Sequence, residues 1–181
     1  MKKVALVIGH NERSKGAYSK ILNQSEFDYY SDIATLISQA NQTMDIYLRK
    51  PNKGYIQEMI PVVQSINLHG YDFVLELHFN SVSDPQVAGA LCLAHQKSFK
   101  GQRIAKLFLN KLCKEYSLKN KGIINITQSN QRGGFGICKT NCPYILIEPF
   151  FAGNKEAEKF KDKERFASFI VSFIQEVQNE Q

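Results

Sequence analysis

Short runs of consecutive apolar residues alternate in this chain with longer segments in which apolar residues recur every three or four positions. Uninterrupted runs are typical of strands buried on both faces, and the longer period is typical of helices that bury one face. The pattern predicts strands at residues 4–9, 44–48, 72–79, 89–94, 123–127 and 144–148. It predicts helices at residues 26–41, 55–68, 100–116 and in a C-terminal segment whose Phe166, Ile170, Phe173 and Val177 share one face. Pro61 should kink the second of these helices or cut it short.

Strands and helices that alternate along a chain are typical of an α/β fold. We therefore expect an α/β protein with a mainly parallel or mixed central sheet of about six strands, flanked by helices on both faces. With 181 residues and 43% hydrophobic content, the chain is long enough to bury a substantial core. No Pro- or Ser-rich linker, repeat or low-complexity tract interrupts it, so we expect residues 1–181 to form a single domain.

Four ionisable residues stand at the ends of these predicted elements. His10 follows the first strand, His78 ends the third, Glu148 closes the last, and Glu26 opens the first helix. The carboxyl ends of parallel strands share one edge of an open sheet, where ligands bind, so we expect these four groups to gather there. Two imidazoles and one carboxylate are a sufficient set for a catalytic zinc ion, and the second carboxylate is then left as a base.

Glu26 has two interpretations. On a helix it falls on the same side as Tyr30, Ile33 and Ile37, which is the face that should be buried. Burying a carboxylate costs several kcal/mol unless a cation or hydrogen-bond donors meet it, and a metal ion would meet that need. Alternatively, a carboxylate at the start of a helix simply caps that helix and complements its dipole.

The other three residues also have structural alternatives. His78 shares one face of its predicted strand with Glu76. Both His78 and His10 can alternatively be structural residues, which end a buried strand and form hydrogen bonds with neighbouring groups. Two histidines at one sheet edge favour a metal site, because His is the commonest metal ligand. Glu148 stands between apolar residues, where desolvation should raise its pKa toward the value that a general base needs. The alternative for Glu148 is a salt bridge to a buried Lys or Arg.

Composition narrows the list of partners. The net charge of +6 is spread over scattered Lys and Arg residues, with a modest concentration between Lys97 and Lys121, and there is no nucleic-acid motif. We expect no nucleic-acid partner and no membrane span, because no stretch approaches the ~20 apolar residues that a span needs. The apolar run after Met1-Lys2-Lys3 is too short for a signal peptide, so we expect synthesis in the cytoplasm and free thiols at the four cysteines. The spacing of Cys138 and Cys142 suits a zinc site only weakly, because no second pair accompanies it.

Four segments of the chain resemble a known enzyme family. They are Ile8-Gly9-His10, Glu26, the segment Phe73-Val74-Leu75-Glu76-Leu77-His78-Phe79-Asn80-Ser81 and the segment from Ile145 to Asn154. In this order they resemble the zinc N-acetylmuramoyl-L-alanine amidases of the amidase-3 type, and the resemblance runs from Val4 to the final helix. That family has a Gly-His pair, a Glu on the first helix, a strand that ends in His-x-Asn-Ser and a late strand that carries Leu-x-Glu.

The resemblance implies one zinc ion per chain, bound by His10, Glu26 and His78. It implies that Glu148 is the catalytic carboxylate, which takes a proton from the attacking water and delivers it to the leaving amine. The bond cleaved would be the amide between N-acetylmuramic acid and L-alanine, so the partner would be peptidoglycan or a muropeptide. Asn80 is expected to donate a hydrogen bond to the substrate.

The chain departs from the family in three places, one of which, Phe79 where Ala is usual, does not bear on the chemistry. Asn11 to Ala17 replaces a segment that usually has glycines and an Asp, and Glu76 stands where a small polar residue is common. Glu76 can orient His78, add charge near the metal or pair with a Lys. The Gly-rich segment from Gly133 to Thr140 is not a phosphate-binding loop, because it precedes a strand and lacks the last Gly. We expect a mobile loop there, beside the cleft, in contact with glycan or peptide.

Three functions are consistent with these features. The favoured one is a cell-wall amidase, of phage-lysin type because no signal peptide or separate wall-binding module is apparent, which acts as a monomer in the cell wall or periplasm. The second is a zinc amidohydrolase of small N-acyl amino acids. The third is a metal-binding or wall-binding module without catalysis, which the presence of Glu148 argues against.

Overall fold

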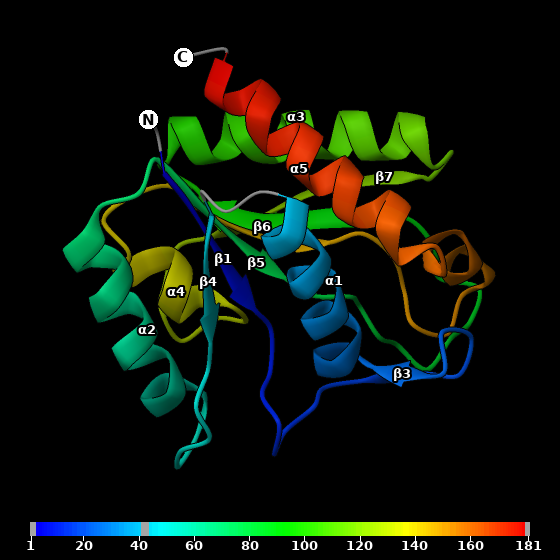
Figure 1. The fold of residues 1–181 in the computed structure, drawn as a ribbon, viewed down its shortest axis with the longest axis horizontal. Coiled ribbons are helices and arrows are strands. Elements are labelled where there is room, and N and C mark those ends of the chain that lie inside the picture. The colour runs from blue at the N-terminus through cyan, green and yellow to red at the C-terminus, as the bar shows by residue number, and fades with distance from the viewer. Residues whose placement is uncertain (1–2, 41–43, 180–181) are drawn as a thin grey trace.

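The computed structural model describes residues 3–40 and 44–179, which are built around a six-stranded sheet (Figure 1). The strand order is β4-β1-β5-β8-β6-β7. The strands are β1 (Val4–Ile8), β4 (Met44–Leu48), β5 (Phe73–Leu77), β6 (Ala90–His95), β7 (Asn120–Ile126) and β8 (Tyr144–Glu148). All neighbouring pairs are parallel except β6 and β8, which are antiparallel. The prediction of an α/β fold with a mixed sheet of about six strands is therefore confirmed.

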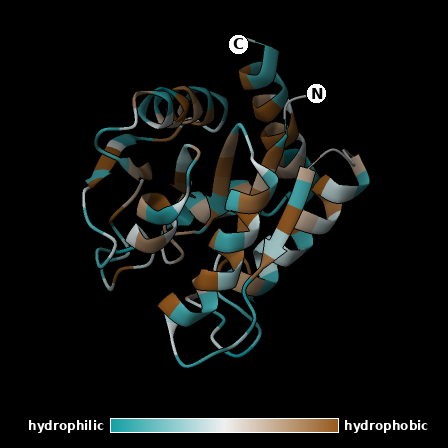
Figure 2. Cartoon of the chain, turned by 90° about the vertical axis from the view of Figure 1, so that its left-hand side faces the viewer, coloured by the Kyte–Doolittle hydropathy of each residue, from teal (hydrophilic) through white to brown (hydrophobic). Residues whose placement is uncertain are grey.

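Helices cover both faces of the sheet, as predicted. Helices α1 (Glu26–Ala40), α3 (Phe99–Glu115) and α5 (Lys163–Asn179) pack on one face, and α2 (Tyr55–His69) and the short α4 (Gly134–Lys139) pack on the other (Figure 1). Hydrophobic and hydrophilic bands alternate along these helices in Figure 2. This banding is the pattern expected of helices that bury one face against a sheet.

The alternation of side chains along β5 separates the core from the site. Phe73, Leu75 and Leu77 join the hydrophobic cluster on the α1 side, whereas Val74 joins the cluster on the α2 side. Glu76 is on the same face as Val74 because successive side chains of a strand point to opposite faces. The prediction that His78 and Glu76 share one face is confirmed, since Nε2 of His78 lies 3.1 Å from Oε1 of Glu76.

Several local expectations need correction or extension. Pro61 does not cut α2 short, since the helix continues to His69. The segment expected to be a loop at residues 133–140 is mostly helix α4, and the pattern missed the two-stranded β2–β3 sheet (Tyr18–Ser19, Gln24–Ser25) and the 3₁₀ helix η1 (Lys155–Phe160). The first predicted helix extended to residue 41, which lies outside the described residues. No helix in the described part of the chain is both long and apolar enough to cross a membrane.

The segments that leave β5 and β8 stay side by side beyond the ends of the strands. The amide of Asn80 donates to the carbonyl of Phe150 (2.9 Å), and the amide of Ala152 donates to the carbonyl of Asn80 (2.8 Å). An isolated parallel bridge joins Asn80 to Phe151. This continued pairing fixes the residues that follow β5 relative to those that end β8, and so it builds one edge of the site.

Candidate metal centre and catalytic site

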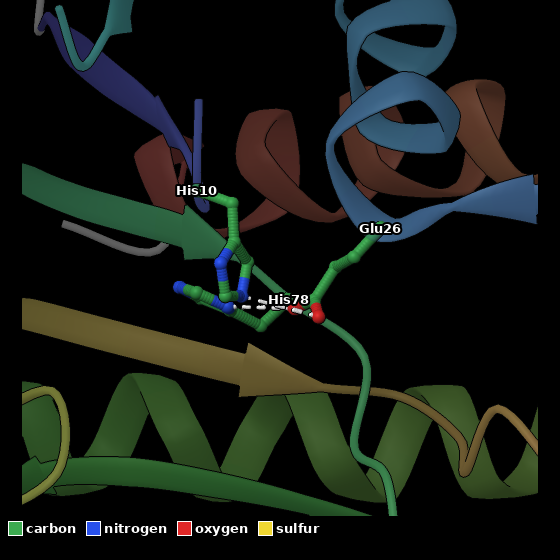
Figure 3. A group of neighbouring side chains, drawn as sticks. All are labelled: His10, Glu26 and His78. Atoms are coloured by element: carbon green, nitrogen blue, oxygen red, sulfur yellow. Dashed lines mark hydrogen bonds and ion pairs between the residues drawn. The ribbon is translucent and has the colours of Figure 1, made fainter. Parts of the chain in front are cut away.

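His10, Glu26 and His78 converge at the carboxyl edge of the parallel strands (Figure 3). One nitrogen or oxygen atom from each lies within 4.8 Å of those from the other two. Nδ1 of His78 lies 2.7 Å from Oε1 of Glu26, and Nε2 of His10 lies 3.2 Å from Oε2 of the same carboxylate. Three residues that are far apart in sequence therefore lie together at this edge of the sheet, as expected from their positions after two strands and at the start of a helix.

Glu26 is directed at the histidines and not at its own helix. It is 3% exposed, and it also accepts hydrogen bonds from the backbone amides of Phe79 (3.0 Å) and Ala17 (3.4 Å). Burial alone would raise the pKa of Glu26, but the hydrogen bonds and charges of His10 and His78 outweigh it and lower this pKa to about 2. The carboxylate is therefore ionised and buried, and none of these donors is the capping contact that the alternative interpretation required.

Close backbone packing permits this convergence. A Cβ atom at Gly9 would lie 2.4 Å from Cε1 of His78, and one at Gly16 would lie 2.6 Å from Cδ2 of His10 and 2.8 Å from Oε2 of Glu26. Gly16 also has a φ of +77°, which glycine adopts without strain. Any side chain at these two positions would occupy the space that the candidate ligands fill.

His10 itself is held in an uncommon conformation. Its φ of 66° is in the left-handed region, which costs a non-glycine residue energy, and residues strained in this way cluster at functional sites. The Nε of Arg49 donates to the carbonyl oxygen of His10 (3.1 Å), and Arg49 is itself buried at the end of β4. Arg49 thus helps to hold the turn that directs the His10 ring toward Glu26.

His78 lies between two carboxylates. Its Nδ1 contacts Glu26, and its Nε2 lies 3.1 Å from Oε1 of Glu76. Burial lowers the pKa of His78, but the hydrogen bonds from its ring to Glu26 and Glu76 raise it to about 9. The site thus favours a positive charge at this position. Two imidazoles and a carboxylate, closely spaced in an acidic environment, fit the ligand set of a catalytic zinc ion.

Glu148 closes β8 beside this centre and is almost completely buried. Its Oε2 accepts a hydrogen bond from Nδ2 of Asn80 (2.7 Å), and its Oε1 is paired with the guanidinium of Arg132. Burial raises the pKa of Glu148 above its ordinary value, although the positive charges of Arg132 and His78 oppose the rise. The carboxyl is therefore desolvated, as expected, and it is also paired with an arginine. The pairing arginine, however, has a side chain that is 57% exposed.

Arg132 was not identified from the sequence. It precedes Gly133, whose left-handed φ of 65° starts the turn into α4, and both residues line the cleft. The Gly-rich run was the available signal, because it indicated a turn near the site. Asn80 was expected to donate a hydrogen bond to substrate, and in the structure both of its side-chain polar atoms have protein partners. Its amide nitrogen donates to Glu148, and its oxygen accepts from the amide of Ser81 (2.8 Å), so its contact with substrate stays a prediction.

The candidate ligands and Glu148 line a single cleft of about 690 Å³. The cleft extends from the metal-binding residues toward the start of α2, where Arg13, Lys53 and Tyr55 border it. This volume is in the range that is typical of ligand-binding pockets, so the cleft can hold part of a larger substrate. The four cysteines are free and none of them borders this cleft.

Comparison with known proteins identifies the family of this chain. The sequence model of the amidase-3 family, described as N-acetylmuramoyl-L-alanine amidase, matches residues 4–176. A comparison with curated protein sequences gives no significant match.

Solved structures share the fold at low sequence identity. An N-acetylmuramoyl-L-alanine amidase from Clostridium difficile 630 is 17% identical, with a TM-score of 0.78 over 99% of this chain and 98% of its own. The catalytic domain of the CD27L endolysin, which targets Clostridia difficile, is 23% identical, with a TM-score of 0.76 over 97% of this chain and 98% of its own. The catalytic domain of CwlV, an amidase from Bacillus (Paenibacillus) polymyxa, is 17% identical, with a TM-score of 0.75 over the whole of both chains.

Proposed function

The chain belongs to the amidase-3 family of N-acetylmuramoyl-L-alanine amidases, and from this premise we propose that it works through one zinc ion held by His10, Glu26 and His78, with Glu148 as the catalytic carboxylate. It is a hydrolase of the amide bond that joins N-acetylmuramic acid to L-alanine in peptidoglycan. The observation that carries the proposal is the convergence of the three ligand atoms within 4.8 Å in the cleft that Glu148 also lines.

A zinc ion bound there would act as a Lewis acid and would lower the pKa of a water molecule bound to it to about 7. Glu148 accepts a proton from the attacking water and then delivers it to the amine of L-alanine, which is the leaving group. Its raised pKa favours the second transfer, since a weakly acidic carboxyl holds a proton more readily near neutral pH.

Arg132 and Asn80 hold Glu148 for this task. The amide of Asn80 fixes one carboxylate oxygen, and the guanidinium of Arg132 pairs with the other. The charge of Arg132 keeps the carboxylate ionised at a lower pH than burial alone would allow. Because the Arg132 side chain also lines the cleft and is 57% exposed, it is accessible to a substrate group when the cleft is filled.

The other candidate functions are not favoured. A hydrolase of small N-acyl amino acids would use the same residues, but the family match points to peptidoglycan. A module without catalysis is opposed by Glu148, which is present, buried and held by two partners. A lytic role of phage type, a monomeric state and action in the cell wall or periplasm stay predictions.

The test is digestion of purified peptidoglycan by the zinc-loaded protein, with the products identified by mass spectrometry. We expect stem peptides with a free L-alanine amine beside intact glycan strands. Glu148→Gln should bind zinc with unchanged stoichiometry and release no peptide, whereas His78→Ala should lose both zinc and activity. Full activity in Glu148→Gln would remove this carboxylate from the mechanism. Zinc binding without release of peptide by the wild type would redirect the search to small N-acyl substrates.

A further inference from the structure

Behind His78 lies a second carboxylate that the proposed catalysis does not use. Glu76 precedes His78 by two residues, on the same face of β5, and its residue exposure is 0%. Its Oε1 lies 3.1 Å from Nε2 of His78, and its Oε2 accepts a hydrogen bond from the hydroxyl of Tyr144 (3.0 Å) on the neighbouring strand β8. Both oxygens of this buried carboxylate are therefore committed to protein partners.

The two ring nitrogens of His78 are directed at different carboxylates. Nδ1 faces Glu26 at 2.7 Å, and Glu26 in turn faces Nε2 of His10 at 3.2 Å. Nε2 of His78 faces Glu76, which is not one of the three residues whose ligand atoms cluster. The nitrogen of His78 on the side of the candidate ligands is thus Nδ1.

We propose that Glu76 is a positioning residue, which accepts the Nε2–H of His78 so that this histidine meets the metal through Nδ1. The inference rests on the proposed function, because it assumes that His78 is a metal ligand. Glu76 does not contact the metal or the substrate in this arrangement. Tyr144 supports Glu76 in this role, since its hydroxyl fixes the orientation of the Glu76 carboxylate.

The physical reason is the ambiguity of imidazole. A neutral ring can carry its proton on either nitrogen, and the hydrogen bond made by one nitrogen determines which of them is left for a metal. A carboxylate acceptor fixes both the tautomer and the ring orientation, and it makes the ligating nitrogen more basic. A buried carboxylate is costly unless it is well paired, and here His78 and Tyr144 supply the pairing.

The direct test is NMR on the wild-type, zinc-loaded protein, with histidine labelled with the heavier nitrogen isotope. Long-range proton–nitrogen correlations distinguish the protonated from the metal-bound nitrogen of each ring. We expect His78 to carry its proton on Nε2 and to bind zinc through Nδ1. Binding through Nε2 would overturn the inference while leaving the proposed function intact. Failure of the wild type to bind zinc would instead refute the proposed function.

Variants give a second, independent measurement. Glu76→Gln keeps the shape of the side chain but replaces the ionised acceptor, so zinc affinity in a competition assay with a chromophoric chelator should fall about 10- to 100-fold. Tyr144→Phe removes only the donor to Glu76 and should give a smaller loss in the same direction. In cobalt-substituted protein, the visible absorption of Glu76→Gln should differ from that of the wild type, because a released His78 ring changes the ligand geometry.

Two matched controls separate positioning from general destabilisation. Glu58→Gln removes another buried carboxylate that lines the same cleft, but its partners are Arg13 and Asn52 and not a histidine. Tyr71→Phe removes the hydrogen bond from another buried tyrosine to a carboxylate, that of the exposed Asp45, at 2.6 Å. Neither should change zinc affinity. If Glu76→Gln loses thermal stability yet binds zinc as tightly as these controls do, Glu76 is only structural and the inference fails. Should the variant not fold, the wild-type NMR result still decides.

Discussion

Replacing Gly9 with alanine is a sharp test of the metal centre, because it perturbs a candidate ligand without touching it chemically. The added Cβ would lie 2.4 Å from Cε1 of His78 and 2.6 Å from each ring nitrogen. Ordinary contacts of this kind begin near 3.4 Å, so the ring must move by about 1 Å. Gly9 does not have a positive φ, so the substitution strains the contact and not the backbone.

The size of the effect follows from two opposing free-energy changes. Overpacking of this kind typically costs about 1–3 kcal/mol, whereas replacing Gly with Ala at a compatible position gains about 0.4–1 kcal/mol from the unfolded chain. The clash therefore outweighs the gain. In the metal-free protein only the hydrogen bonds to Glu26 and Glu76 hold the His78 ring, so it can shift at less cost than when a metal also fixes its position. Most of the cost should therefore fall on the metal-bound state, as a loss of roughly 5- to 150-fold in zinc affinity.

The assay is zinc competition with a chromophoric chelator, combined with thermal unfolding of the metal-free protein. Gly153→Ala is the matched control, because a Cβ there meets nothing within 4 Å and the backbone φ is not positive. It should bind zinc as the wild type does. Wild-type zinc affinity and stability in Gly9→Ala would show that the His78 ring does not lie against Gly9, and the proposed arrangement of the metal ligands would be wrong.

Three further outcomes are expected. The charge of Arg132 lowers the pKa of Glu148, and Glu148 must be ionised to act as the base. Arg132→Gln should therefore move the acidic limb of the pH–rate profile for peptidoglycan hydrolysis to higher pH. An unchanged limb would contradict the pairing of Arg132 with Glu148. Chelation should abolish hydrolysis and lower the melting temperature, and added zinc should restore both. Phe160→Ala should destabilise the fold by about 3–5 kcal/mol in denaturant unfolding, since this buried ring stacks on Phe150 (4.4 Å) and Tyr116 (4.7 Å).

The elements that could be predicted are those whose burial has a clear period. Strands β1, β5, β6 and β8 were visible as nearly continuous apolar runs, because they are covered on both faces. The edge strands β4 and β7 are partly exposed and contain polar residues, so only their apolar positions were visible and the start of β7 at Asn120 was missed. Helix α4 could not be predicted, because six residues that include Gly134 and Gly136 do not complete enough turns to show a helical period. The β2–β3 strands, of two residues each, are likewise too short for any alternation.

The candidate ligands could be predicted because they follow regular elements, whereas their partners could not. His10 and His78 each follow a strand, so the rule for sheet edges places them together. Arg132 comes from an irregular turn, and no sequence period relates it to Glu148. For Glu76 the sequence left three roles open, and the choice among them depends on a hydrogen bond from Tyr144 on another strand, which only the folded register supplies.

Strand direction explains why the chemistry of this chain is gathered at one edge of the sheet. Each of the four strands that run in the same direction delivers a residue of the site at or just beyond its carboxyl end: β1 delivers His10, β4 delivers Arg49, β5 delivers His78 and β8 delivers Glu148. Strands β6 and β7 run in the opposite direction, so their carboxyl ends point to the other edge. There His95 lines a separate cavity of about 300 Å³ together with Cys138 and Cys142. In the described part of the chain these three do not form a metal-binding group, which agrees with the weak zinc spacing of the two cysteines. The reversal of this strand pair thus removes His95 from the catalytic edge, whereas Cys138 and Cys142 are kept from it because they precede the amino end of β8. The candidate ligands at the catalytic edge are two imidazoles and a carboxylate.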